Sequence, residues 1–118
     1  MKRIILVEDS PIIQAAAVYA LGEAGYEVSV RSTYDELMSQ SLTGYDLILM
    51  DVQMPELFGD DVAAVLRNER NVSTPIYLFS SLSKRELQER AQAAKVDGFI
   101  SKEGGMEELV SRVKQILG

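Results

Sequence analysis

The sequence contains no cysteine and no histidine among its 118 residues. Without cysteine, the chain cannot form a disulfide framework, a thiolate nucleophile or a cysteine metal site. Without histidine, it cannot use Ser-His-Asp catalysis, bind zinc through imidazole or carry a phosphohistidine of its own. Carboxylates, hydroxyls, lysine and backbone groups are therefore the chemical groups that any site must use.

Long apolar runs and an excess of positive charge are also absent. No run approaches the roughly 20 residues that a membrane-spanning helix needs, and the opening Met1–Val7 resembles a signal peptide only until Glu8 and Asp9 interrupt it. The net charge of −6 argues against binding to nucleic-acid phosphates. We expect a single domain, residues 1–118, with a cytoplasmic location and neither nucleic acid nor membrane as a partner.

Five short apolar runs alternate with segments of helical periodicity. The runs are mostly continuous, as in parallel strands covered on both faces, and predict strands at Ile4–Val7, Glu27–Val30, Leu47–Met50, Ile76–Phe79 and Gly98–Ile100. Capping patterns predict helix starts at Ser10-Pro11, Thr33 with Glu36, and Ser83 with Glu86, whereas Gly25 and Gly44 fit helix ends. This order predicts an α/β fold with a parallel sheet between two layers of helices.

In such a sheet the reactive site lies beyond the carboxyl ends of the strands. Polar residues come just after four of the predicted strands, and those considered are Glu8, Asp9, Asp51, Ser80, Ser81 and Lys102. Any one of them alone is explained as a helix cap or a solvated side chain. Three carboxylates, a hydroxyl and a lysine on one edge together favour a functional site.

The chemistry open to this set is limited. Clustered carboxylates repel one another and are stable together when a cation lies between them. Oxygen ligands without imidazole or thiolate suit Mg²⁺. A divalent cation, an ammonium group and a hydroxyl can cradle a phosphoryl group, and a carboxylate can then act as the nucleophile and form an aspartyl phosphate.

These residues resemble the response regulator receiver domains of two-component signalling over the whole chain, and are similar to the chemotaxis regulators among them. The resemblance rests on Glu8-Asp9, on Asp51-Val-Gln-Met54-Pro55 with Gly59, on Pro75, on Ser80, and on Phe99-Ile-Ser-Lys102. It implies a flavodoxin-like, doubly wound sheet of five parallel strands in the order 2-1-3-4-5 with five helices. It also implies a module that catalyses only its own phosphorylation and dephosphorylation.

The resemblance implies a role for each matching residue. Asp51 would accept the phosphoryl group, and Mg²⁺ would be held by Glu8, Asp9, Asp51 and the backbone carbonyl of Gln53. Lys102 would pair with Asp51 and later with a phosphoryl oxygen, and Ser80 would bond the phosphoryl group. Phe99 occupies the switch aromatic position and would turn inward, altering the face made by the fourth helix, fifth strand and fifth helix. The implied partners are a histidine kinase or phosphotransfer protein and a downstream target or effector domain.

Three positions depart from the family pattern. Lys102 precedes Glu103, Gly104 and Gly105 where a proline often follows. We expect a trans bond there or a rearranged loop, because a cis bond before glutamate costs about 2.5–4 kcal/mol. Lys95 stands where glycine is common, and Leu82 stands where many relatives carry a polar side chain near the attacking water. We expect Leu82 to slow loss of the phosphoryl group.

Other functions remain open. A degenerate receiver could serve as a phosphorylation-independent interaction module. A phosphatase with an aspartyl nucleophile would want a second aspartate where Gln53 stands, and a flavodoxin would find Glu8 and Asp9 repelling its phosphate. The sequence does not decide between a stand-alone receiver and a domain of a larger regulator.

Overall fold

The structure, a computed structural model, describes residues 1–55 and 57–118 and has a three-layer arrangement. Five strands form one parallel sheet in the order β2-β1-β3-β4-β5, which confirms the predicted fold. The strands are β1 (Arg3–Val7), β2 (Glu27–Arg31), β3 (Leu47–Asp51), β4 (Ile76–Ser80) and β5 (Gly98–Ser101). Each agrees with its predicted run to within one residue at either end.

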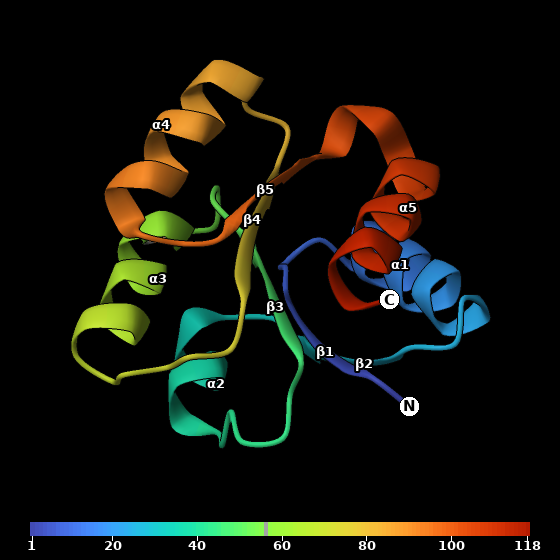
Figure 1. Ribbon diagram of the computed structural model, residues 1–118, viewed down its shortest axis with the longest axis horizontal. Coiled ribbons are helices and arrows are strands. Elements are labelled where there is room, and N and C mark those ends of the chain that lie inside the picture. Colours follow the sequence, from blue (N-terminus) through green and yellow to red (C-terminus); the bar gives the residue numbers. More distant parts are fainter. Residues whose placement is uncertain (56) are drawn as a thin grey trace.

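The helices lie on both faces of the sheet (Figure 1). Helices α1 (Pro11–Glu23) and α5 (Gly105–Leu117) cover one face, and α2 (Tyr34–Ser39), α3 (Gly59–Asn68) and α4 (Lys84–Ala94) cover the other. A short 3-10 turn, Lys102–Gly104, joins β5 to α5. Each face therefore has its own hydrophobic core, as a fully covered parallel sheet requires.

The predicted helix starts are confirmed. Side-chain oxygens of Ser10, Thr33 and Ser83 accept hydrogen bonds from backbone N–H groups three residues later, at Ile13, Glu36 and Glu86. These caps satisfy donors that the first helical turn leaves without partners. They begin α1, α2 and α4 directly beyond the carboxyl ends of β1, β2 and β4.

One of the two predicted helix ends is wrong. Gly25 follows α1 at a φ of 97° and acts as the expected terminator. Gly44 also has a positive φ, 85°, but α2 already ends at Ser39 with Gln40 as its cap. Gly44 instead lies in the turn before β3, since seven residues, 40–46, separate the end of α2 from that strand.

The loop after Lys102 has rearranged in the way its glycines allow. No cis peptide bond occurs in residues 1–55 and 57–118, so the expected trans bond after Lys102 is confirmed. Ser101 caps the 3-10 turn by accepting the N–H of Glu103. Gly105 then has φ 69° and ψ −164°, a combination that residues with a side chain avoid.

Lys95 ends α4 in the left-handed conformation, with φ 60° and ψ 36°. This conformation suits glycine, which is common at this position in the family. A residue with a side chain is disfavoured here by roughly 1 kcal/mol relative to glycine. No helix in the described part of the chain is long and apolar enough to cross a membrane.

Candidate functional site

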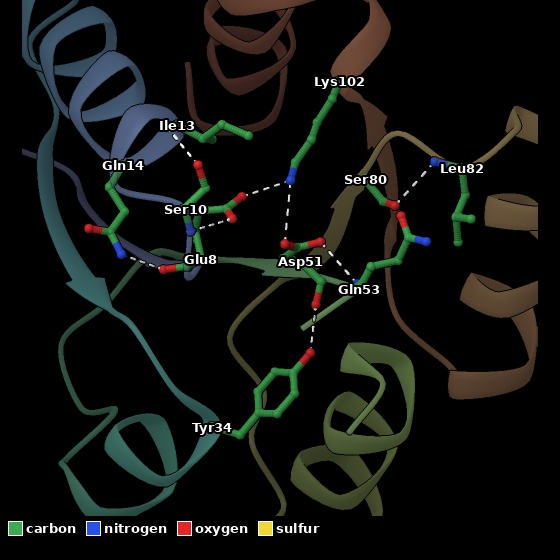
Figure 2. Close-up of polar contacts among 10 residues, drawn as sticks. All are labelled: Glu8, Ser10, Ile13, Gln14, Tyr34, Asp51, Gln53, Ser80, Leu82 and Lys102. Carbon is green, nitrogen blue, oxygen red and sulfur yellow. Dashed lines mark hydrogen bonds and ion pairs between the residues drawn. The ribbon is translucent and has the colours of Figure 1, made fainter. Parts of the chain in front are cut away.

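The polar strand ends converge at one edge of the sheet, as the fold requires. Glu8 and Asp9 follow β1, Asp51 ends β3, and Lys102 follows β5. Figure 2 shows Glu8, Asp51 and Lys102 pointing toward one another from these separate segments. Four members of the predicted set are therefore brought together: Glu8, Asp9, Asp51 and Lys102.

Two of the three carboxylates are buried. Glu8 and Asp51 are 1% and 4% exposed, whereas Asp9 faces solvent. One carboxylate oxygen from each residue lies within 4.8 Å of the others. This spacing fits a small divalent cation, whose oxygen ligands must approach one centre.

Lys102 is the positive charge at the centre of this group. Its ammonium donates a hydrogen bond to Oε1 of Glu8 at 2.7 Å and lies 3.4 Å from Oδ2 of Asp51. The sequence predicted a pairing with Asp51 and did not suggest the shorter contact with Glu8. The Lys102 ammonium also lies 5.2 Å from the ring centre of Phe79, at the end of β4.

Backbone groups fix the two buried carboxylates. Oε2 of Glu8 accepts the N–H of Ser10 at 3.1 Å, and Oδ1 of Asp51 accepts the N–H of Gln53 at 3.0 Å. The side-chain amide of Gln14, in α1, donates to the main-chain carbonyl of Glu8. The loops after β1 and β3 thus hold both acids in defined orientations (Figure 2).

The surroundings of Asp51 make its ionisation less favourable than that of an exposed aspartate. Burial raises the pKa of Asp51 to about 6, and the neighbouring Glu8 carboxylate adds to that rise. Lys102 and the Gln53 N–H act in the opposite direction on the same pKa. One ammonium thus does not balance three carboxylates, and an added cation would stabilise the ionised form.

Ser80, at the end of β4, lies beside this group (Figure 2), whereas Phe99 is the second residue of β5. Ser80 is fully buried, and its Oγ accepts the N–H of Leu82 at 3.2 Å. Phe99 is half-buried and packs against the core between the sheet and α4. Ser81, also named by the sequence, is exposed.

Gly59 is explained by close packing rather than by a special φ. A β-carbon at this position would lie 2.0 Å from the main-chain oxygen of Asp51. The first residue of α3 therefore passes directly against the backbone of Asp51. Glycine is required because any side chain would displace one of these two segments.

Sequence reasoning missed Tyr34. This residue begins α2, is 6% exposed, and donates its hydroxyl to the main-chain carbonyl of Asp51 at 2.9 Å. Burial, followed by the nearby carboxylates, raises the pKa of Tyr34, so the hydroxyl remains a donor. A tyrosine directly after a helix cap follows no recognisable sequence motif. Its hydrogen bond to Asp51 depends on how α2 packs on the sheet, which the sequence does not show.

Comparison with known proteins identifies the family. The model of the response regulator receiver domain matches residues 4–114, so this chain belongs to that family. Receiver domains are signalling domains rather than classical enzymes, and they bind Mg²⁺ at an acidic pocket.

Curated relatives carry the same region within longer chains. A gliding motility regulatory protein of Myxococcus xanthus is 36% identical over 97% of this chain, which covers 15% of that protein. The regulatory protein VanRB of Enterococcus faecalis is 32% identical over 98% of this chain, and 52% of that protein is covered. The chain thus spans about half, or less, of the length of these two relatives.

Solved structures agree with the fold. Chemotaxis protein CheY4 of Vibrio cholerae superposes with a TM-score of 0.86 at 25% identity, covering 99% of both chains. TrrA of Thermotoga maritima, solved with Mg²⁺ and BeF, has a TM-score of 0.81 at 29% identity over 99% of this chain and 100% of that one. TrrA has also been solved in complex with histidine kinase ThkA.

Proposed function

We propose that this receiver domain accepts a phosphoryl group on Asp51 from a phosphohistidine of a histidine kinase or phosphotransfer protein. The main support is the position of the buried Asp51 carboxylate beside that of Glu8. Both carboxylates lie within 3.4 Å of the Lys102 ammonium. A nucleophile, charge-stabilising groups and cation ligands are thus in one place. The complex of the relative TrrA with a histidine kinase supports the choice of donor.

The transfer is a displacement at phosphorus. A carboxylate oxygen of Asp51 forms the new P–O bond while the P–N bond of the donor breaks. The imidazole leaves with the electron pair of that bond and takes up a proton from water. After transfer, the Lys102 ammonium can pair with a phosphoryl oxygen, because it already lies between the carboxylates of Asp51 and Glu8.

The ligand set fits Mg²⁺. Glu8, Asp9 and Asp51 supply carboxylate oxygens that lie within 4.8 Å of one another, and we assign the fourth protein ligand to the backbone carbonyl of Gln53. When bound, the ion supplies positive charge that offsets the phosphoryl oxygens. The carboxylate excess over Lys102 is the observation that favours a cation here.

The output follows from the neighbouring strand ends. In the phosphorylated form, Ser80 would turn its hydroxyl from the Leu82 N–H toward a phosphoryl oxygen. That movement would free space next to Phe99, which is half-buried against the core on the α4 side. We propose that Phe99 turns inward and changes the α4-β5-α5 face, which then binds a downstream protein or effector domain.

The domain boundaries, residues 1–118, and a cytoplasmic location belong to the same proposal. Support for the boundaries comes from the match over residues 4–114 and from the single five-stranded sheet. A protein target is favoured over nucleic acid or membrane because the chain carries a net charge of −6.

The decisive experiment is phosphorylation by acetyl phosphate with Mg²⁺, followed by intact mass. The wild-type chain should gain one phosphoryl group, and Asp51→Asn should gain none. Asp35→Asn, which removes an exposed carboxylate of α2, should label like the wild type. A wild-type chain that stays unlabelled would instead favour the degenerate receiver that acts only as an interaction module.

A further inference from the structure

The backbone carbonyl of Asp51 is held from two sides. On one side, the buried hydroxyl of Tyr34 donates to this oxygen at 2.9 Å (Figure 2). On the other, Gly59 approaches so closely that an added β-carbon would lie 2.0 Å away. The N–H of Gly59 also donates to the carbonyl of Val52 at 3.0 Å. The peptide units directly after the phosphoacceptor therefore have little freedom to rotate.

The orientation of these peptide units matters for the carboxylate itself. The Val52–Gln53 peptide unit, whose carbonyl accepts the Gly59 N–H, carries the Gln53 N–H that donates to Oδ1 of Asp51 at 3.0 Å. The same residue supplies the carbonyl that we assign to the cation. A rotation of the Asp51–Val52 peptide would carry the two following peptide units with it. It would thereby displace both the Gln53 N–H that donates to the nucleophile and the Gln53 carbonyl that we assign to the metal.

We propose that Tyr34 is a positioning residue for phosphorylation of Asp51. Its hydroxyl fixes the Asp51 carbonyl, and the backbone then directs Gln53 toward the carboxylate and the cation. Tyr34 does not touch the phosphoryl group and acts only through the main chain. The inference rests on the proposed function and adds α2, an element outside the predicted site, to the phosphorylation machinery.

The test uses Tyr34→Phe, which keeps the buried ring and removes the hydroxyl. The chain offers a matched control, Tyr26→Phe. Tyr26 is 7% exposed and donates its hydroxyl to the main-chain oxygen of Gly118 at 3.2 Å. Tyr26 directly precedes β2 and therefore lies at the amino end of the sheet, opposite to the site. Both variants lose one hydrogen bond from the hydroxyl of a buried tyrosine to a main-chain oxygen, so a general loss of stability should affect both.

Three measurements separate positioning from stability. Tyr34→Phe should lower the Mg²⁺ affinity of the unphosphorylated protein by about 5-fold in titration calorimetry, as the loss of one hydrogen bond allows. Its labelling rate with acetyl phosphate should fall by about the same factor, and the Gln53 amide signal should shift in the ¹H–¹⁵N spectrum. Tyr26→Phe should match the wild type in all three.

A folded Tyr34→Phe protein with wild-type Mg²⁺ affinity and labelling rate would overturn the inference while leaving the proposed function intact. Failure of the wild type itself to label would count against the proposed function instead. If Tyr34→Phe does not fold, Tyr34→Met offers an unbranched apolar replacement without a hydroxyl. The same three measurements then apply with the same expected outcome.

Discussion

The two ends of the sheet use charged side chains in opposite ways. At the amino ends of β4 and β5, Arg67 of α3 donates to the carbonyls of Val72 and Thr74 and pairs with Asp97. Asp97 in turn accepts the N–H of Ile76 at 2.8 Å. At the carboxyl ends, three carboxylates face one lysine.

The comparison distinguishes charged groups that stabilise the fold from charged groups that form a binding site. The Arg67–Asp97 pair is electrically balanced, and its hydrogen bonds join α3 to the segments that lead into β4 and β5. The acidic group beside Lys102 carries excess negative charge, and burial opposes ionisation of Asp51. Balanced groups stabilise a fold, whereas an unbalanced buried group costs stability and indicates a site that binds something positive.

The largest expected effect on stability comes from removing the Arg67–Asp97 pair, which forms the balanced end of the sheet. Arg67→Met removes several hydrogen bonds to backbone carbonyls and leaves Asp97 without its partner, so the free energy of unfolding should fall by about 2–3 kcal/mol. Denaturant titration measures this. Acetyl phosphate labelling of the folded fraction should stay at the wild-type level, and a loss of labelling would show that the two ends are not separable.

The next effect is a pH dependence of stability at the unbalanced end, which is formed by Glu8, Asp9, Asp51 and Lys102. Because the pKa of Asp51 is about 6 in the folded chain, against 3.8 for an ordinary aspartate, the folded state binds the proton more tightly. The stabilising contribution of the protonated form is complete below pH 3.8 and is lost as the pH rises through about 6.

Asp51→Asn should lack this part of the pH dependence. Above pH 6 in EDTA, it should exceed the wild type by up to about 2–3 kcal/mol in free energy of unfolding. Denaturant titrations at several pH values test this, and added Mg²⁺ should narrow the gap. Parallel pH profiles for the two proteins would contradict the assignment of Asp51 as a destabilising buried charge.

A smaller effect lies again at the balanced end. The carbonyl of Lys95 accepts a hydrogen bond from Nε of Arg67 at 3.4 Å, and Lys95 itself is left-handed. Lys95→Gly should relieve the backbone strain and raise the free energy of unfolding by roughly 1 kcal/mol. Thermal unfolding measures the gain. Lys95→Ala serves as the control, since it keeps the strain and should show no increase.

The smallest effect concerns the lifetime of the phosphoryl group. Leu82 follows Ser80 at the unbalanced end and is half-buried against the core on the α4 side. Leu82→Glu, which offers a group able to orient water, should speed dephosphorylation by about 2- to 5-fold, less than about 1 kcal/mol in barrier. The decay of the phosphorylated mass after removal of acetyl phosphate measures it, and an unchanged rate would end the idea.

Much of the fold could be predicted because its signals are local. The apolar runs gave every strand to within one residue, and the caps at Ser10, Thr33 and Ser83 are confirmed by side-chain hydrogen bonds. The helix end predicted at Gly44 is wrong because a glycine with positive φ occurs in turns as well as at helix ends. The sequence shows the need for glycine without showing which element it ends.

The site was predictable as a set of residues and less so as a set of contacts. Strand order places Glu8, Asp51 and Lys102 on one edge, and that much follows from topology. The 2.7 Å contact of Lys102 with Glu8 depends on the conformation of the loop after β5, where the usual proline is missing. The hydrogen bond of Tyr34 to the Asp51 carbonyl depends on how α2 packs against the sheet, and no local sequence pattern predicts that packing.

The backbone of that loop also has a use in recognising related sequences. Gly105 has φ 69° and ψ −164°, so this turn requires glycine three positions after the lysine. A search that demands proline directly after the lysine would pass over chains with this loop. The pattern Lys-x-x-Gly at the end of the fifth strand would find them, and would sort receivers by the turn that carries their lysine.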